Sequence, residues 1–241
     1  MWPFNTKSLK KSGIFNGFTD WHSHILPGVD DGIQNIEDSL AVLNTYEELG
    51  FSKVWLTPHI MEDYPNQTAM LKEKFNELKS RWNGNVEISL AAENMLDSLY
   101  ETRLNEKDLL PIGDERAHLL VETSYYTPPY GMEEMIEKTK AIGYFPILAH
   151  PERYRYMDEK DYERWKKEGI LFQMNILSLV GGYGETAQRK AHWLLDNDMI
   201  DLVGSDLHNL DSVMEWIRKS PKKKTYLDKL FDVVNKKNKL L

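Results

Sequence analysis

Short apolar runs alternate with helical patterns along most of this chain, and that alternation restricts the folds it can adopt. Helical spacing is seen, for example, at Ile36, Leu40 and Leu43. Asn35 is placed to begin that helix and Gly50 to end it. Further helices are predicted at 70–82, 132–142, 158–168, 185–196 and 220–241. Seven runs rich in apolar and β-branched residues are predicted to be strands: 18–22, 53–57, 86–92, 118–122, 145–149, 170–175 and 200–204.

The order of these elements predicts an α/β barrel. Strands that alternate with helices pair in parallel, because each crossover returns the chain to the same end of the sheet. No linker, repeat or low-complexity segment interrupts the pattern. We therefore expect residues 18–241 to form a single domain and residues 1–17 to form a leader before it.

Charge and composition exclude several classes of protein. The 241 residues carry a formal net charge of -8, which suits a chain that does not bind nucleic acid across a broad basic face. There is no cysteine. A disulfide framework, a thiolate zinc site and a cysteine-based phosphatase mechanism are therefore excluded.

The leader contains Lys7, Lys10 and Lys11 but no apolar run long enough for a signal peptide. No stretch of the chain approaches the roughly 18 apolar residues of a membrane span. We expect the leader to be a frayed basic end, with a weak interfacial anchor as the alternative. These features predict a cytoplasmic protein.

Histidines and carboxylates gather at the ends of the predicted strands. Six of the seven strands end in such a residue, and five of the seven histidines belong to this set. Barrel enzymes place their active sites at the carboxyl ends of the strands. His22 and His24, two apart on one strand, face the same way and could bind one metal ion. Each signal is weak alone, but together they predict a metal site.

Several other features carry less information. His118 begins a strand and His192 lies inside a helix, so both are expected to be packing or surface residues. The aromatic segment 125–130 either lines a pocket for an aromatic ring or is a packed connection. Gln173 and Asn175 are candidates for the floor of the site. The lysine-rich tail is expected to be a solvated helix face, with docking of an acidic partner as the alternative.

The residues at and just after the strand ends form ordered motifs: His22-Ser23-His24, Asp30-Asp31-Gly32, Thr57-Pro58-His59, Glu93, Glu122, His150-Pro151-Glu152-Arg153-Tyr154 and Ser205-Asp206-Leu207-His208-Asn209. Together they resemble the polymerase and histidinol phosphatase (PHP) superfamily over roughly residues 18–210. Within it, residues 24–32 and the His-Pro-Glu-Arg-Tyr run resemble capsular-polysaccharide tyrosine phosphatases of the CpsB type.

This resemblance implies a distorted (β/α)7 barrel of the PHP type with three metal ions, Mn²⁺ or another divalent metal such as Fe or Zn. One ion would be held by His22, His24, Glu93 and Asp206. A second would be held by Glu93, Glu122 and His150, and a third by Asp31, His59 and His208. Arg153 would bind the phosphate. Relatives carry a second arginine shortly after the last motif, whereas here the nearest is Arg218.

The function implied is hydrolysis of phosphotyrosine by a metal-activated water, on a tyrosine kinase that regulates polysaccharide synthesis or export. His59 or His208 could supply a proton to the leaving group. A small-molecule phosphatase of the histidinol-phosphate type is the runner-up, because it shares the metal set. A polymerase-associated nuclease is disfavoured by the acidic charge. A regulatory module without turnover is disfavoured by the intact set of nine ligands.

Overall fold

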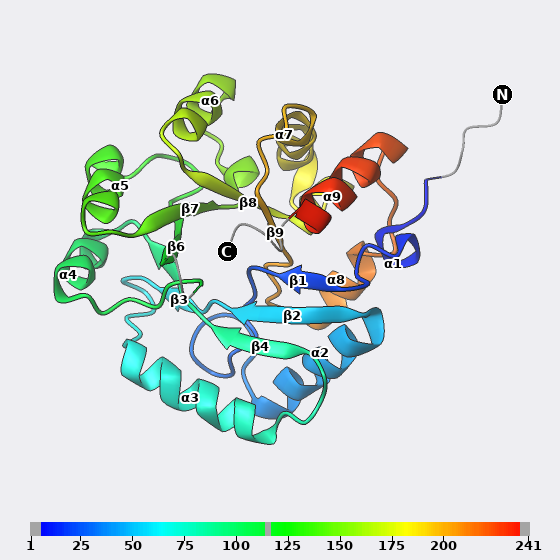
Figure 1. Cartoon of the computed structure of the whole chain (residues 1–241), viewed down its shortest axis with the longest axis horizontal. Helices are drawn as coiled ribbons and strands as arrows, with labels where there is room; N and C mark the ends of the chain where they lie inside the picture. Colours follow the sequence, from blue (N-terminus) through cyan, green and yellow to red (C-terminus); the bar gives the residue numbers. More distant parts are fainter. Residues whose placement is uncertain (1–5, 114–116, 237–241) are drawn as a thin grey trace.

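The computed structural model describes residues 6–113 and 117–236, which form two parallel sheets flanked by helices (Figure 1). One sheet has the strand order β1-β2-β4 and the other β3-β5-β6-β7-β8-β9. The strands are β1 (Phe18–Asp20), β2 (Phe51–Leu56), β3 (His59–Ile60), β4 (Glu87–Leu90), β5 (Glu93–Met95), β6 (His118–Glu122), β7 (Phe145–Ala149), β8 (Leu171–Asn175) and β9 (Leu202–Gly204). Parallel α/β architecture was predicted and is confirmed.

The described residues form nine strands where seven were predicted, because β3 and β5 are short strands that begin just after two of the predicted strands end. Pro58, which has no N–H to donate, separates β2 from β3, and Ala91-Ala92 separates β4 from β5. Pairing continues across the break through Glu93 N–H, which donates to Pro58 O at 3.1 Å. Each new strand begins with a candidate ligand, His59 or Glu93.

The predicted single closed barrel is not confirmed, since the strand pairing gives two sheets. The sheets are nevertheless connected beyond the ends of β1 and β9. His24 N–H donates to Leu207 O at 3.0 Å, and Ser23 forms an isolated parallel bridge with Leu207. This connection brings the first and last motifs of the sequence together.

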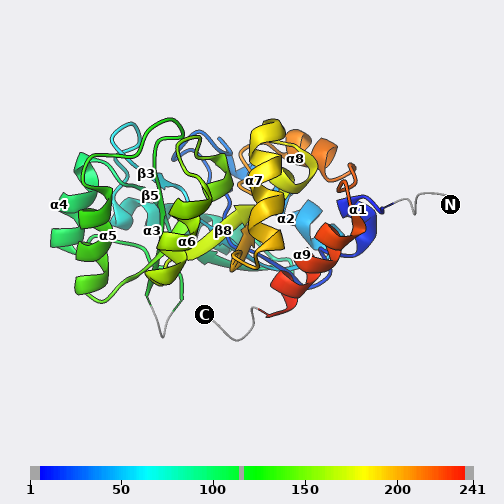
Figure 2. The ribbon, with the colours of Figure 1, turned by 90° about the horizontal axis from the view of Figure 1, so that it is seen from above.

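Most predicted helices are present and lie on the outside of the sheets (Figures 1 and 2). The Asn35 side chain caps α2 by accepting from Asp38 N–H, and Gly50 ends it at a φ of 96°. These two residues confirm the predicted start and stop. The helices that cover the sheets are α2 (Ile36–Leu49), α3 (Thr68–Arg81), α4 (Ser98–Glu106), α5 (Met132–Ala141), α6 (Glu159–Lys167), α7 (Gly184–Asp196) and α9 (Lys224–Lys236).

Short helices were not predicted, although two of them carry a capping signal. Asp97 caps α4, and Asn209 caps α8 (Leu210–Trp216). The other short elements are α1 (Leu9–Ser12) and the 3-10 helices η1 (Pro151–Arg153) and η2 (Ile176–Val180). Too few apolar positions fall within such lengths to reveal a helical period.

An inner apolar cluster connects the two sheets beneath the strand ends. Trp21 follows β1 and Trp55 lies on β2, and their rings stack at 6.3 Å. Leu120 belongs to the same cluster and lies two residues before Glu122 on β6. Side chains two apart on a strand share a face, so the candidate ligand Glu122 lies on the face that carries this cluster. The cluster therefore forms a hydrophobic floor under the strand ends.

The leader is packed rather than frayed over its described part, which corrects the prediction. Leu9, Ile14 and Phe15 are buried in the main core. Leu9 N–H donates to Lys219 O at 3.1 Å, so α1 is held against the chain that follows α8. Residues 1–5, and 237–241 of the predicted tail helix, lie outside the described residues. Among the helices described, none is both long and apolar enough to cross a membrane.

This packing predicts that Leu9 stabilises the whole domain. Leu9→Ala should lower the free energy of unfolding by about 2–4 kcal/mol, because the side chain is fully buried. Lys10→Ala is the matched control, because Lys10 is the next residue and its side chain is exposed. This substitution should change the free energy of unfolding by no more than about 0.5 kcal/mol. Urea denaturation followed by circular dichroism measures both. Equal, small effects would mean that α1 does not pack in solution.

Candidate metal centre

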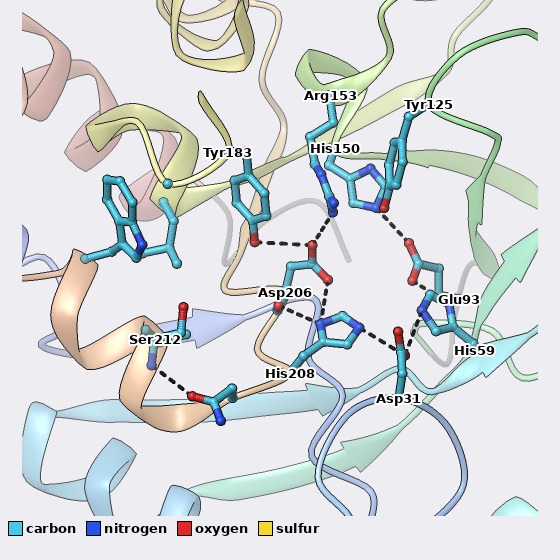
Figure 3. Close-up of a pocket in the computed structure, with 15 residues that line it drawn as sticks. Asp31, His59, Glu93, Tyr125, His150, Arg153, Tyr183, Asp206, His208 and Ser212 are labelled. Carbon is cyan, nitrogen blue, oxygen red and sulfur yellow. Dashed lines mark hydrogen bonds and ion pairs between the residues drawn. The ribbon is translucent and has the colours of Figure 1, made fainter. Parts of the chain in front are cut away.

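The strand ends bring all nine predicted ligands into one region of the molecule. Figure 3 shows those that line the cavity: Asp31, His59, Glu93, His150, Asp206 and His208. Seven of the nine are buried, while His208 and Asp31 keep side-chain exposures of 31% and 52%. Elements far apart in the sequence contribute them, from the residues after β1 to those after β9. The nine are His22, His24, Asp31, His59, Glu93, Glu122, His150, Asp206 and His208.

His22 and His24 share a face because the backbone between them is extended and bridged. Ser23 lies between them and points the other way, where its hydroxyl donates to Trp55 O at 2.9 Å. The two imidazole Nε2 atoms are only 3.0 Å apart. Each lies close to one oxygen of Glu93, at 3.1 Å from His22 and 3.3 Å from His24. Asp206 Oδ1 is 3.5 Å from both nitrogens.

A second group of ligand atoms surrounds His59 Nδ1. This nitrogen lies 3.1 Å from Glu93 Oε2 and 3.0 Å from Glu122 Oε1. His150 Nε2 approaches the same two carboxylates, at 3.0 Å from Glu93 Oε1 and 3.8 Å from Glu122 Oε2. Glu93 therefore faces both groups, as the resemblance implied. His59 joins this second group as well, which the resemblance did not imply.

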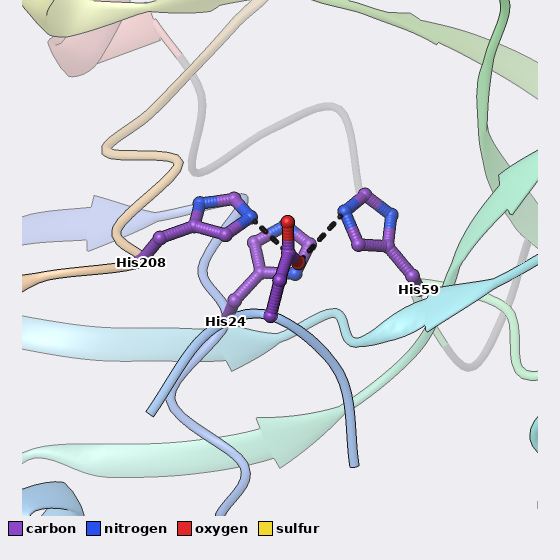
Figure 4. A group of neighbouring side chains, drawn as sticks. His24, His59 and His208 are labelled. Atoms are coloured by element: carbon purple, nitrogen blue, oxygen red, sulfur yellow. Dashed lines mark ion pairs between the residues drawn. The ribbon is translucent and has the colours of Figure 1, made fainter. Parts of the chain in front are cut away.

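The third group lies at the open side of the site (Figure 4). Asp31 Oδ1 is 3.3 Å from His208 Nε2 and 3.5 Å from His59 Nε2. His24 completes the group from below, and its ring centroid is 3.9 Å from that of His208. This group has the most exposed carboxylate of the set, so it is the one that solvent and substrate reach first.

The arrangement fits metal ions better than it fits hydrogen bonds. His59 Nδ1, Glu93 Oε2 and Glu122 Oε1 are all buried, yet none has a hydrogen-bond partner among the described residues. Leaving such groups unsatisfied costs about 1–3 kcal/mol each. When a cation binds its ligand atoms at about 2.1 Å, neighbouring ligand atoms lie about 3 Å apart, which is close to the spacing of these nitrogen and oxygen atoms. The residues present therefore fit a site for divalent metal ions with mixed histidine and carboxylate ligands.

Electrostatics keep the two central carboxylates ionised. Burial alone would raise the pKa of Glu93, but the neighbouring His22 and His59 hold it well below its ordinary value. Burial likewise opposes ionisation of Asp206, and the charges of His22 and Arg153 nevertheless lower its pKa far below the usual range. Both side chains thus present negative oxygens that could bind a cation.

Residues behind the ligands fix their orientation. Asp30 Oδ2 is 2.8 Å from His24 Nδ1, which leaves Nε2 of that ring facing the site. The same oxygen accepts from His59 N–H at 3.0 Å. Neighbouring hydrogen bonds of this kind set the tautomer and the rotation of a metal-binding histidine. Asp30 belongs to the sequence motif but was not predicted to have this role.

Gln173 and Asn175 link two ligands across the floor, as their positions suggested. Gln173 Oε1 is 2.8 Å from His22 Nδ1, and its amide donates to Asn175 Oδ1 at 3.0 Å. Asn175 then donates to Asp206 Oδ2 at 2.6 Å. A chain of hydrogen bonds therefore joins His22 to Asp206 on the side away from solvent.

Arg153 lies between two aromatic rings beside the ligands (Figure 3). Its guanidinium carbon is 4.3 Å from the centroid of Tyr125 and 4.4 Å from that of Tyr183. Its Nη1 donates to Asp206 Oδ2 at 2.6 Å. The two rings flank the guanidinium and restrict its movement, and its fork of donors suits it to bind an anion. Tyr183 was not identified from the sequence, because a tyrosine between glycines carries no sign of a site on its own.

Two ligands have strained backbones where strands end. His150 follows β7 with a φ of 32°, and Asp206 follows β9 with a φ of 52°. Side chains other than glycine rarely adopt this left-handed region, and such strain concentrates at functional sites. The turn at His150 leads directly into η1, which carries Arg153. Backbone strain thus places a candidate ligand and the candidate phosphate-binding residue within one short turn.

A cavity of about 450 Å³ opens over this site. One end is polar and is lined by candidate ligands and Arg153. The other end is apolar and is formed by Leu177, Val213 and Trp216. None of these three was predicted, because apolar residues in short helices look like core residues in a sequence.

The remaining predicted features lie elsewhere. Tyr125 lines the cavity, but Tyr126 and Tyr130 of the same segment are 65% and 102% exposed. Arg218 is exposed and does not line the cavity, so it offers no second cation there. His118 and His192 are buried away from the site, and His192 stacks on Tyr226. Their predicted packing role is confirmed.

Comparisons with known proteins point to one family. The family model described as capsular polysaccharide synthesis, CpsB/CapC, matches residues 18–237. Tyrosine-protein phosphatase YwqE of Bacillus subtilis is 27% identical over 197 residues, which cover 79% of this chain and 77% of that protein. Tyrosine-protein phosphatase CpsB of Streptococcus pneumoniae is 26% identical over 235 residues, or 90% of each chain.

A solved structure agrees with these matches. A chain from the crystal structures of YwqE from Bacillus subtilis and CpsB from Streptococcus pneumoniae, described as unique metal-dependent tyrosine phosphatases, matches with a TM-score of 0.78. The two chains are 25% identical, and the match covers 90% of this chain and 91% of the other. The arrangement of sheets and helices is therefore shared over nearly the whole chain.

The contacts of Asp30 predict that it controls metal affinity although it faces away from the ions. Asp30→Ala should weaken binding of Mn²⁺ by about 10–100-fold, because His24 loses the partner that orients it. Competition with a fluorescent chelator measures the affinity. Asp63→Ala removes an exposed carboxylate four residues after His59 and should leave the metal affinity unchanged. Unchanged affinity in both variants would show that His24 needs no orienting partner.

Proposed function

The chain belongs to the CpsB/CapC family of capsular polysaccharide synthesis proteins, and on that basis we propose that it is a metal-dependent phosphatase that hydrolyses phosphotyrosine in proteins. The proposal rests on one arrangement of side chains. Histidines and carboxylates that could bind metal ions lie beside Arg153, which is flanked by an aromatic ring, and the cavity that they line also has apolar side chains in its wall. The names of the relatives YwqE and CpsB support the same activity.

We assign the ligands to three groups, two of which share Glu93. Glu93 and Asp206 would hold one ion with His22 and His24, and Glu93 would hold a second with Glu122 and His150. Asp31, His59 and His208 would hold the third. Three divalent ions, which we take to be Mn²⁺ or another transition metal such as Fe or Zn, would outweigh the charge of the four carboxylates and favour a phosphate dianion. When bound, the ions supply an activated water nucleophile and stabilise charge on the phosphoryl group.

The residues around the ligands have separate roles in this proposal. Arg153 offers planar donors to two phosphate oxygens, held in place by Tyr125 and Tyr183. His208 and His59 lie at the open side of the site, where either could donate a proton to the departing phenolate. A phenolate leaves with a pKa near 10, so it needs less protonation than an alkoxide does.

The shape of the cavity supports an aryl phosphate. An aromatic ring attached to a phosphate at Arg153 would find Tyr125 on one side and the apolar end at Leu177 and Trp216 on the other. A phosphoserine side chain is too short to fill that end, so it would gain less from burial. The runner-up substrate, histidinol phosphate, carries an imidazole and an amine that these apolar residues would not satisfy.

The wider proposal concerns the setting of the enzyme. We infer a cytoplasmic phosphatase domain at residues 18–241 whose two sheets together form a distorted seven-unit barrel. Its substrate would be a tyrosine kinase that regulates polysaccharide synthesis or export. The family description and the absence of a membrane-spanning helix among the described residues are consistent with this setting.

Substrate comparison tests the proposed activity. With Mn²⁺ present, the protein should hydrolyse a phosphotyrosine peptide faster than a phosphoserine peptide or histidinol phosphate. A chelator should abolish turnover, added Mn²⁺ should restore it, and elemental analysis should find two to three ions per chain. Faster turnover of histidinol phosphate would favour the runner-up. Full activity in chelator would rule out the metal mechanism.

Arg153 provides a second test, because it is placed to bind phosphate without being a ligand. Arg153→Ala should weaken phosphate binding by about 2–4 kcal/mol while the metal content is retained. Arg153→Lys should recover only part of this loss, since an ammonium is a point charge. Steady-state kinetics with a phosphotyrosine peptide measure both, with Arg155→Ala as the control for an exposed arginine two residues away. Parent-like kinetics for Arg153→Ala would place the phosphate clamp elsewhere.

A further inference from the structure

One edge of this acidic molecule is strongly basic. The segments 6–12 and 217–224 lie side by side at one end of the structure, which both views show (Figures 1 and 2). Lys10 N–H donates to Ile217 O at 2.8 Å and so connects them. We call their exposed cations the basic edge: Lys7, Lys10, Lys11, Arg218, Lys219, Lys222, Lys223 and Lys224.

The charge of the basic edge is largely uncompensated. Neither segment contains an aspartate or a glutamate, although the whole chain has a net charge of -8. Within the described residues, Lys224 pairs with Asp228 at 2.7 Å, and Lys219 lies 3.9 Å from Glu215. No ion pair within the described part of the chain involves the other six cations. A solvated helix face usually alternates in charge, and this edge does not.

The basic edge rests on a rigid base. Leu9 and Ile217, which flank the connecting hydrogen bonds, are 0% and 1% exposed. Pro221 is also buried, so the segment between α8 and α9 is fixed to the core. The backbone positions of the cations are therefore fixed without a partner, so no chain segment has to be ordered to gather them on binding.

We propose that the basic edge docks this protein on the surface of an anionic lipid membrane. Clusters of four to eight Lys and Arg residues are the usual size of such a surface, and each cation near anionic headgroups adds to the attraction. Binding of this kind is peripheral and reversible, because it depends on charge rather than on insertion of a helix.

The composition of the edge favours a membrane over an acidic polypeptide. Seven of the eight cations are lysines, which act as point charges and do not recognise carboxylates through two parallel hydrogen bonds as arginine does. The side chains are exposed, and none of them lines the cavity of the active site. Diffuse attraction to a charged surface needs only the number and proximity of the cations, both of which are met here.

The position of the edge would orient the cavity relative to the membrane. Trp216, the last residue of α8, lines the cavity. Arg218 of the basic edge follows it by two residues. A molecule bound through the basic edge therefore keeps its cavity beside the lipid surface rather than beneath it. Polypeptide segments that emerge near the membrane would be within reach.

Vesicle sedimentation tests the proposal on the full chain. The protein should sediment with vesicles that contain phosphatidylglycerol but not with vesicles of phosphatidylcholine alone, and 0.5 M NaCl, about a 4 Å screening length, should release it. Lys7→Glu, Lys222→Glu and Lys223→Glu combined should reduce binding at least tenfold. The matched control combines Lys72→Glu, Lys74→Glu and Lys79→Glu on α3, which changes the net charge equally and should bind within threefold of the parent.

Both triple variants should hydrolyse a soluble phosphotyrosine peptide like the parent, since neither set touches the metal centre. This readout separates failure of the docking proposal from failure of the proposed activity. No sedimentation of the parent with phosphatidylglycerol vesicles would overturn the proposal, as would equal loss in both variants. Binding to polyglutamate without binding to the vesicles would also overturn it and would assign the edge to an acidic protein instead.

Discussion

The need to place negative oxygens and imidazole nitrogens within about 3 Å of one another governs the architecture of this protein. His59 Nδ1 lies 3.1 Å from Glu93 Oε2 and 3.0 Å from Glu122 Oε1, yet none of the three atoms has a hydrogen-bond partner among the described residues, which suits them to share a cation. The two sheets can bring these groups together because parallel strands end on the same side. The stacked indoles of Trp21 and Trp55 then close the space below, so the ligands face solvent from one direction only.

The interruptions in the strands serve the same requirement. A continuous strand turns alternate residues to opposite faces, which limits how many ligands one strand can offer. Pro58 and Ala91-Ala92 end one strand and let another begin at His59 and at Glu93, in the adjacent sheet. At His150, after β7, and at Asp206, after β9, the backbone adopts the left-handed conformation, and the chain changes direction there as well. The site is therefore built from departures from regular sheet geometry, held in place by the regular elements around it.

Most of the fold could be predicted from local patterns in the sequence, and the candidate ligands from motifs. Features that depend on contacts between distant residues could not be predicted. The parallel α/β class followed from alternating periods, and the helix from Asn35 to Gly50 followed from its caps. The nine candidate ligands could be named because they stand at strand ends within motifs that resemble those of a known family. Tyr183 and Trp216 were missed, since their roles arise only when a turn and a short helix reach Arg153 and the cavity. The packing of α1 was missed because four residues are too few to show a helical period.

The docking of α1 also bears on how the protein folds during synthesis. Leu9 N–H donates to Lys219 O and His24 N–H donates to Leu207 O, so during synthesis these two segments find their partners only after β9 has been made. Contacts that span almost the whole chain fold slowly, because a large loop must close before they form. Phe15 and Phe18 can pack on Phe51 early in synthesis, whereas Leu9 and the first histidines wait for the segments after β9. One edge of the first segment is therefore covered early and the other late, and an uncovered apolar edge is the kind of surface that chaperones bind.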